Sequence, residues 1–128
     1  MTLKDYQILN REAWQKFAEE YKEPAEKAWE SGDPHWGIWQ LPEAKLELLP
    51  SDLKGKKCIE IGCGAGYVSS WMARRGAEVI GIDPTPNQLE TARLLEKQYQ
   101  LGIEFVEGFG EKLPFPDSCF DFAISEYG

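Results

Sequence analysis

The sequence has 128 residues, of which 42% are hydrophobic and 28% charged, and its formal net charge is −8. This length and composition indicate one globular domain. The acidic balance excludes a surface that follows nucleic-acid phosphates, because affinity for phosphates comes from clustered Lys and Arg. No apolar run approaches the roughly 18 residues of a membrane span, and the first ten residues lack the apolar core of a signal peptide. We therefore expect a cytoplasmic protein, with no membrane or nucleic-acid partner, that acts on small molecules.

In chain order, the first predicted element is an amphipathic helix from about Asp5 to Tyr21, because its apolar residues recur three or four positions apart. Pro24 is predicted to end this helix and to begin a second, short helix through Trp29, since proline prefers the first helical turn. Ser31 to Pro34 is typical of a turn. Four of the five tryptophans precede residue 40. Two hypotheses stay open for this segment: a lid with an aromatic surface, or rings that pack on the core of the following domain.

From residue 43 onward, helices and strands alternate. A short helix is predicted over Glu43 to Leu49, and Gly76 is predicted to end the helix that carries Val68, Trp71 and Met72. Gly108 to Asp117 is predicted to be a loop with one helical turn. The predicted strands are Lys57 to Ile61, Ala77 to Ile82, Ile103 to Glu107 and Phe120 to Ser125. Strands separated by helices or crossovers imply right-handed βαβ units and a parallel sheet, so we predict an α/β fold.

The segment Cys58 to Gly66 runs from the first of these strands through a glycine loop into a helix. Gly62, Gly64 and Gly66 permit a sharp turn and the close approach of a ligand. A dinucleotide fingerprint requires GxGxxG after a strand, but here Tyr67 stands where the last glycine would be. Glu60 adds a negative charge at the end of the strand, which would repel a pyrophosphate and suit a cationic ligand. The alternative is that these glycines serve only the turn.

Asp83 lies 21 residues beyond Gly62, at the carboxyl end of the second strand. Doubly wound folds place an acid there to bind the ribose hydroxyls of a nucleoside. An Asp before a proline is, alternatively, a turn-former. Thr85, Pro86 and Gln88 then predict a helix start, with a capping threonine, a proline in the first turn and a capping-box glutamine.

The three cysteines, Cys58, Cys63 and Cys119, form no CxxC pair. They fit neither a disulfide framework nor a zinc site, and we expect no metal. Small core side chains in a reducing compartment are the favoured interpretation. Cys63 differs because its backbone N–H lies in the glycine loop.

Four segments together resemble the class I methyltransferases that use S-adenosylmethionine, the type 11-like group, over roughly residues 42 to 128. These segments are Glu60 to Gly66, Gly81 to Asp83, Glu107 to Phe115 and Phe120 to Ser125. The resemblance implies a Rossmann-like doubly wound parallel sheet of strand order 3-2-1-4. It also implies a boundary, with residues 1–41 as a helical, Trp-rich leader or lid and residues 42–128 as an incomplete S-adenosylmethionine-binding domain.

The resemblance further implies roles for individual residues, with S-adenosylmethionine as cofactor and S-adenosylhomocysteine as product. Glu60 would lie near the cationic amino group, with the glycine loop against the methionine part and Asp83 on the ribose. Ser125 ends the fourth strand, which faces the methyl group. The implied cofactor-binding residues are Glu60, Gly62, Cys63, Gly64, Asp83, Pro84, Gln88, Gly110, Glu111 and Ser125.

Two departures from the family pattern affect the expected site. Phe109 replaces an aspartate that accepts a hydrogen bond from the adenine amino group in many relatives, which leaves the Gly110 N–H or stacking by Phe109 to serve adenine. The family continues through three further strands, whereas this sequence ends at Gly128, so the fourth strand would be an exposed edge. We expect that edge to be covered by the leader, by a second copy in a homodimer, or by a further part of the native protein.

Methyl transfer from a sulfonium requires mainly positioning and exclusion of water, so no triad or metal is needed. A base is needed only if the acceptor must lose a proton first. Glu126, Tyr127 and His35 are candidates by location, and no catalytic residue is assigned. The expected function is methyl transfer to an unidentified small-molecule acceptor. The alternatives are a fragment or homologue that binds without turnover and, because of the glycine loop and Asp83, an NAD(P)-dependent oxidoreductase.

Overall fold

The computed structural model describes residues 5–31, 34–37, 39–110, 115 and 119–126. In that part of the chain the helices are α1 (Asp5–Glu30), α2 (Glu43–Leu46), α3 (Tyr67–Arg74) and α4 (Pro86–Tyr99). The strands are β1 (His35–Trp36), β2 (Leu41–Pro42), β3 (Lys57–Ile61), β4 (Glu78–Asp83), β5 (Glu104–Glu107) and β6 (Phe122–Ile124). The predicted helical turn between Gly108 and Asp117 falls largely outside the described residues.

The main sheet is parallel, and its described strands lie in the order β5-β4-β3-β6. This order agrees with the 3-2-1-4 order implied by the resemblance, and the α/β Rossmann-like fold is confirmed. The first predicted strand has the predicted bounds, whereas the second and third begin one residue late. The Ala77 N–H bonds to the Met72 carbonyl at 3.3 Å and the Ile103 N–H bonds to Glu96 Oε1 at 3.1 Å, so neither joins a ladder.

The last strand is shorter than predicted, Phe122–Ile124 instead of Phe120 to Ser125. Just before this strand, the Asp121 carboxylate accepts the Lys57 N–H at 2.8 Å. A side-chain oxygen thus takes the place of the backbone carbonyl that a longer ladder would use. Among the described residues β6 pairs with β3 alone. The three expected coverings of its other edge stay predictions.

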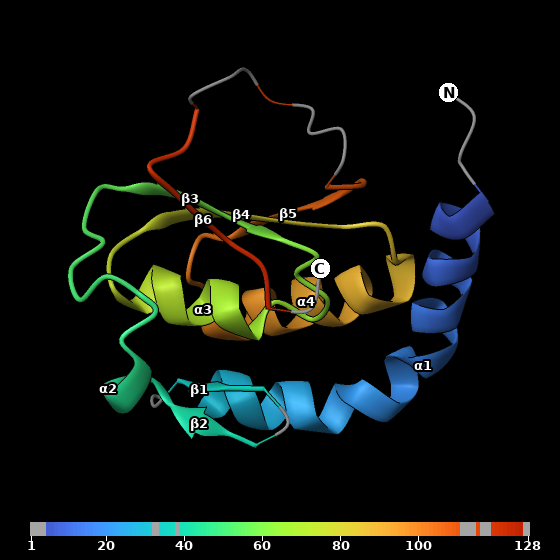
Figure 1. The fold of residues 1–128 in the computed structure, drawn as a ribbon, viewed down its shortest axis with the longest axis horizontal. Coiled ribbons are helices and arrows are strands. Elements are labelled where there is room, and N and C mark those ends of the chain that lie inside the picture. The colour runs from blue at the N-terminus through green and yellow to red at the C-terminus, as the bar shows by residue number, and fades with distance from the viewer. Residues whose placement is uncertain (1–4, 32–33, 38, 111–114, 116–118, 127–128) are drawn as a thin grey trace.

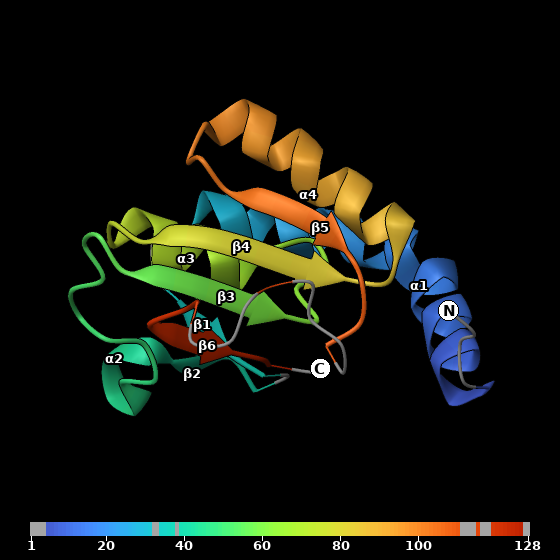
Figure 2. The same cartoon turned by 90° about the horizontal axis from the view of Figure 1, so that it is seen from above.

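Helices α3 and α4 lie on the same face of the sheet, with the second part of α1 beyond them (Figure 1). The order β3, β4, β5 runs in one direction across the sheet, and right-handed crossovers in one direction place their helices on one face. The chain then returns to the opposite side of β3 to form β6, as Figure 2 shows from above. The order therefore reverses at β3, and the carboxyl ends of β3 and β6 form the switch point where such sheets bind ligands.

One continuous helix replaces the two that were predicted around Pro24. Proline removes one helical hydrogen bond and its ring displaces the preceding turn, which accounts for the bend of α1 visible in Figure 1. The helix continues because its last turn is fixed to α3: the Trp71 indole N–H donates to the Ala28 carbonyl at 3.1 Å and the Arg74 guanidinium donates to the Trp29 carbonyl. Before the bend, Tyr6 and Leu9 of the predicted apolar stripe are 54% and 67% exposed, so that end of the stripe faces solvent.

The leader contributes to the core. Trp29 is fully buried, stacks on Tyr99 at 5.8 Å between ring centroids, and donates its indole N–H to the Ala65 carbonyl at 2.9 Å. Trp36 is also buried and packs edge-on against Trp71. Trp39, in contrast, is 80% exposed. Core packing, one of the two hypotheses for the leader, is confirmed for Trp29 and Trp36. The predicted boundary after residue 41 stays a prediction.

Two predicted helix ends differ in detail. The helix predicted over Glu43 to Leu49 ends at Leu46, because Glu47 adopts a left-handed conformation with φ 51°. The side chain of Glu43 then accepts the N–H groups of Leu48 and Leu49, which the helix would otherwise have used. Thr85 does occupy the position before α4, but its side chain makes no cap hydrogen bond.

Among the described residues, no helix combines the length and the apolar character that crossing a membrane requires.

Candidate functional site

The glycine loop folds back on the next strand through its own backbone. Gly62, Gly64 and Gly66 have φ of 68°, 54° and 81°, a region that favours glycine. The N–H groups of Gly62 and Cys63 both donate to the Ile82 carbonyl, at 2.8 and 3.0 Å. A phosphate cradle needs such N–H groups directed at the ligand. Here the N–H groups of Gly62 and Cys63 instead bond to β4. They are not available to a ligand, which disfavours pyrophosphate binding at the loop.

The last glycine of the loop is required by packing. A Cβ on Gly66 would lie 2.5 Å from Phe105 Cζ and 3.4 Å from Trp29 Cζ2. Tyr67 begins α3 directly after this glycine, and its ring packs edge-on against Trp71.

Glu60 is the acid of β3 that precedes the loop, and it is only 3% exposed. Its Oε1 accepts the Ser69 N–H at 2.9 Å and the Ser69 hydroxyl at 2.8 Å. The pKa of Glu60 is raised from 4.5 to about 8, chiefly by burial; the charges of Glu126 and Asp83 add to the rise, and the Ser69 hydrogen bonds oppose it. The charged Glu60 expected from the sequence is thus largely neutral at pH 7, and a cation beside it would favour the ionised form.

Asp83 connects the glycine loop to the start of α4. Its Oδ2 accepts the Gly64 N–H at 2.9 Å and its Oδ1 accepts the Thr85 N–H at 2.8 Å. Burial raises the pKa of Asp83, and hydrogen bonds from the Thr85 side chain and from the Gly64 and Thr85 backbone lower it. A carboxylate offers about four lone-pair sites. Asp83 therefore stabilises the turn and can still accept a further hydrogen bond beside the glycine loop.

The other predicted nucleoside residues surround this acid. Gln88 is 5% exposed, and its Cδ lies 3.9 Å from the position of a Cβ on Gly64. Pro84 is half-buried between Asp83 and α4. Gly110 lies over the end of β3, since a Cβ there would be 2.4 Å from Ile61 Cγ2. Glu111 lies outside the described residues.

The end of β6 meets both α3 and the leader through Glu126. Its carboxylate accepts the Tyr67 hydroxyl and, at 2.9 Å, the Gly37 N–H. Ser125 beside it is exposed. Of the other base candidates, His35 lies 5.4 Å from the Trp71 ring, between centroids, and Tyr127 is outside the described residues.

The structure thus brings Glu60, Gly64, Asp83 and Gln88 together at the switch point, with Glu126 close enough to act on Glu60 electrostatically. Sequence reasoning missed Ser69 and the contact between Tyr67 and Glu126. A signal for Ser69 exists in the sequence, because Ser69 and Ser70 interrupt an otherwise apolar helix face and both are fully buried. No group of three or more His, Cys, Asp or Glu in the described part of the chain could hold a metal ion.

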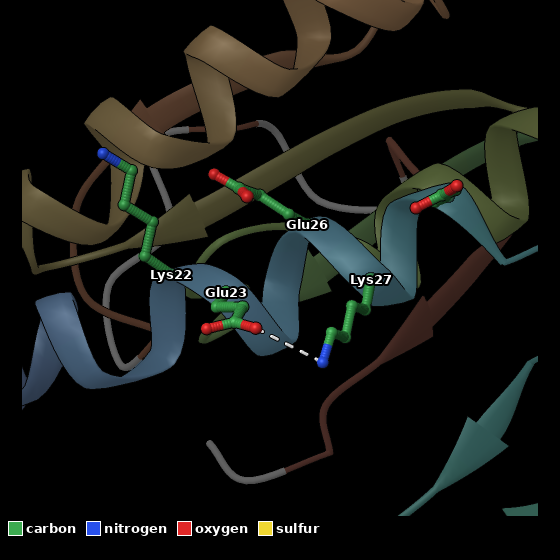
Figure 3. A pocket seen from close by; sticks show the side chains of 5 residues that line it. Lys22, Glu23, Glu26 and Lys27 are labelled. Atoms are coloured by element: carbon green, nitrogen blue, oxygen red, sulfur yellow. Dashed lines mark ion pairs between the residues drawn. The ribbon is translucent and has the colours of Figure 1, made fainter.

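Two surface hollows lie away from these residues. One, of about 520 Å³, is lined by Lys22, Glu23, Glu26, Lys27 and Glu30, all from α1 (Figure 3). Its Lys27–Glu23 ion pair at 3.3 Å joins side chains that are 74% and 78% exposed, which is typical of a solvated helix face. The other, of about 960 Å³, lies at α2 and Arg75, beside the amino ends of the strands. Because α/β sheets bind ligands at the carboxyl ends of their strands, those ends are the better candidate for the functional site.

A family model described as a methyltransferase domain matches residues 59–128. The chain belongs to this methyltransferase family. It is 36% identical over 101 residues to a ubiquinone biosynthesis O-methyltransferase from Histophilus somni, a match that covers 73% of this chain and 42% of the relative. It is also 36% identical over 77 residues to a fatty-acid O-methyltransferase from Mycolicibacterium smegmatis, covering 59% of this chain and 27% of the relative. The chain spans less than half the length of these relatives.

Solved structures agree with this assignment. An S-adenosylmethionine-dependent methyltransferase from Mesorhizobium loti is 31% identical with a TM-score of 0.55, over 64% of this chain and 37% of that one. A protein from Methanococcus maripaludis has a TM-score of 0.68 over 87% of this chain and 49% of its own, at 22% identity, and shows the likeness of fold. The predicted membership of the class I S-adenosylmethionine-dependent methyltransferases is confirmed, and the two alternative functions gain no support.

Proposed function

We propose that this chain binds S-adenosylmethionine at the carboxyl ends of β3, β4 and β5, and that the protein transfers the methyl group to a small-molecule acceptor. The observation that carries the proposal is the position of two buried acids at the carboxyl ends of the neighbouring strands β3 and β4. Asp83 is bonded to the Gly64 N–H and the α4 start, and Glu60 lies two residues before the loop with no described cation bonded to it. S-adenosylmethionine, with a diol on its ribose and an amino cation on its methionine part, matches these two acids.

In this proposal each predicted residue keeps its role. The Glu60 carboxylate faces the amino group, the backbone of Gly62, Cys63 and Gly64 lines the methionine part, and Asp83 accepts the ribose hydroxyls. Pro84 and Gln88 line the nucleoside, Gly110 lies toward adenine, and Ser125 faces the methyl side; the role of Glu111 at adenine stays a prediction. The loop N–H groups of Gly62 and Cys63 contact Ile82 instead of the ligand. The loop would therefore contact the ligand chiefly through its Cα atoms and carbonyl groups.

The chemistry asked of these residues is positioning. The cofactor supplies an electrophilic methyl group on a sulfonium, and the protein has to place an acceptor atom in line with it and to exclude water. Glu126, at the end of β6, is the described carboxylate closest in sequence to the predicted methyl-facing residue Ser125. It would take up a proton only from an acceptor that must lose one.

Residues 1–41 are proposed to act as the leader that borders the acceptor side. The contact between the Gly37 N–H and Glu126 supports this, because it places the leader beside the end of β6. The names of the relatives, which concern ubiquinone biosynthesis and fatty acids, support a small-molecule acceptor. The formal net charge of −8 supports it too, because it disfavours a nucleic-acid substrate.

Calorimetric titration of the chain with S-adenosylhomocysteine and, separately, with NAD tests the cofactor assignment. We expect heat from S-adenosylhomocysteine alone, and heat from NAD alone would refute the proposal. Asp83→Asn should weaken S-adenosylhomocysteine binding about tenfold, because it converts one acceptor oxygen into a donor that faces the ribose or the Gly64 N–H. The matched control is Asp121→Asn, a change at the amino end of the sheet where Asp121 also accepts a backbone N–H. This control should leave the affinity unchanged.

A further inference from the structure

Ser69 makes an unusual pair of hydrogen bonds in the interior of the chain. It is fully buried on α3, and both its N–H and its hydroxyl donate to the same oxygen, Oε1 of Glu60, at 2.9 and 2.8 Å. Two donors on one oxygen, one of them fixed in a helix backbone, hold the carboxyl group in a single orientation. The orientation of Glu60 is therefore set by Ser69.

The other carboxyl oxygen of Glu60 is left for a ligand. Oε2 accepts no hydrogen bond from the described residues. No fully buried side-chain nitrogen or oxygen in the described part of the chain lacks a partner. Oε2 must then retain access to solvent, although the whole residue is only 3% exposed.

The charged groups near Glu60 supply no positive partner. The described charges that act on it are Glu126, which follows β6, and Asp83, at the end of β4, and both are negative. The Cys63 thiol in the loop is neutral at pH 7, because burial raises its pKa well above the ordinary value. Among the residues that the structure describes, therefore, no cation is placed to pair with Oε2.

A purely structural role explains only part of this arrangement. Ser69 is the third residue of α3, and the first N–H groups of a helix have no partner within the helix. Gly66 before the helix offers no side-chain cap, so Glu60 serves as the acceptor for the Ser69 N–H. The cap needs that N–H bond alone. The hydroxyl bond adds nothing to the cap, but it fixes the direction in which Oε2 points.

We infer that Ser69 is a positioning residue for the amino group of the ligand, because its two hydrogen bonds to Oε1 direct Oε2 of Glu60 toward that cation. This inference rests on the proposed function and adds a residue to it. Ser69 itself does not touch the ligand. It acts through Glu60, and it should affect only ligands that carry the amino group.

Two nucleosides that differ in this group test the inference. S-adenosylhomocysteine carries the amino acid part, whereas 5′-methylthioadenosine keeps the adenosine and the sulfur and lacks the amino group. In Ser69→Ala we expect the Kd for S-adenosylhomocysteine to rise about tenfold, as expected for a lost hydrogen bond to a charged group. The Kd for 5′-methylthioadenosine should stay within about twofold of the parent value.

Ser70→Ala is the matched control. Ser70 is the next residue of α3, is equally buried, and donates its hydroxyl at 2.5 Å to the Tyr67 carbonyl instead of to Glu60. This variant loses the same atom from the same helix and should leave the ratio of the two Kd values unchanged. Thermal melting of both variants checks that α3 remains folded.

The double variant decides whether Ser69 acts through Glu60. Once Glu60→Gln has removed the carboxylate, Ser69→Ala should change the S-adenosylhomocysteine affinity by less than about twofold. Equal losses for the two nucleosides in Ser69→Ala, or a full further loss in the Glu60→Gln background, would overturn the inference while leaving the proposed function standing. Binding of neither nucleoside by the parent chain would overturn both.

Discussion

Two buried glutamates lie at opposite ends of the parallel strands, and their bonding partners differ. Glu43, beside the amino ends of the strands, is 4% exposed and accepts hydrogen bonds from the N–H groups of Leu48 at 2.6 Å and Leu49 at 3.2 Å and from the Trp36 indole at 3.3 Å. It also pairs with Arg75 at 3.1 Å. Glu60, at the carboxyl ends, is 3% exposed, with one serine as donor and two acids as charged neighbours.

The difference fits a structural role for Glu43 and the cation-binding role proposed for Glu60. A buried carboxylate remains charged at acceptable cost only when a cation and hydrogen-bond donors replace its water. Glu43 has both, and its contacts tie the leader, α2 and the end of α3 to one another. Glu60 has hydrogen-bond donors but no described cation. Its charged form is therefore costly until a cation binds beside it. Equal burial therefore accompanies two different sets of partners.

The largest expected effect is on the structural acid. Glu43→Ala removes the acceptor of three N–H groups and the partner of Arg75, whose side chain is 24% exposed. Removing one partner of a buried ion pair costs about 3 kcal/mol, and we expect a loss of that size in the free energy of unfolding, measured with urea. The Kd for S-adenosylhomocysteine, measured where the variant is folded, should be nearly unchanged.

Glu90→Ala is a suitable control, since Glu90 is exposed on α4 and should change stability by less than about 0.5 kcal/mol. If Glu43→Ala were as mild as this control, Glu43 would not be a structural acid and the comparison with Glu60 would fail.

The second effect is a pH dependence specific to Glu60. Because its pKa is raised from 4.5 to about 8, the folded chain keeps a proton that the unfolded chain has lost between these values. The stabilising contribution of Glu60 is therefore fully present below pH 4.5 and is lost as the pH rises to about 8. Within this window the loss approaches about 1.4 kcal/mol per pH unit. Asp83, whose pKa is also raised by burial, contributes in the same direction from a lower pH.

Glu60→Gln isolates this contribution, because glutamine can accept both Ser69 donors and does not titrate. Urea unfolding of parent and variant at a series of pH values gives a difference curve in which the parent loses stability relative to the variant across the window and then levels off. A flat difference curve would show that Glu60 is charged in the folded chain, and would remove the contrast with Glu43.

The sheet and its two flanking helices follow from the sequence because their signals are local. Lys57 to Ile61 is an apolar run that ends in a glycine turn, and the structure gives the strand the same bounds. Pro24 misled the prediction of α1, because proline normally ends a helix, whereas contacts from Trp71 and Arg74 hold the last turn in place. Such long-range contacts leave no periodic signal in the sequence.

The sequence predicts where the acids of the site lie, but not the protonation state of Glu60. The positions of Glu60 and Asp83 follow from the strand ends. The neutral form of Glu60 depends on its burial beneath α3 and on the charges of Asp83 and Glu126, which come from other strands. The two hydrogen bonds of Ser69 likewise require the crossover helix to pack on β3. Glu43 carried no sequence signal, because a glutamate at a helix start is commonly an exposed residue.

The smallest expected effect concerns the neighbour that tunes Glu60. Glu126 raises the pKa of Glu60 by its charge, but less than burial does, and Tyr67 and Gly37 hold it in place. Glu126→Gln removes that charge while keeping an oxygen that can accept one of these donors. The upper end of the Glu60 window should then move to lower pH, measured by comparing Glu126→Gln with the Glu126→Gln/Glu60→Gln double variant. Glu107→Gln removes an exposed acid at the end of β5 and is the control, since the charges that raise the pKa of Glu60 are those of Glu126 and Asp83. An unchanged window in Glu126→Gln would mean that burial and the charge of Asp83 raise the pKa of Glu60 without a contribution from the acid after β6.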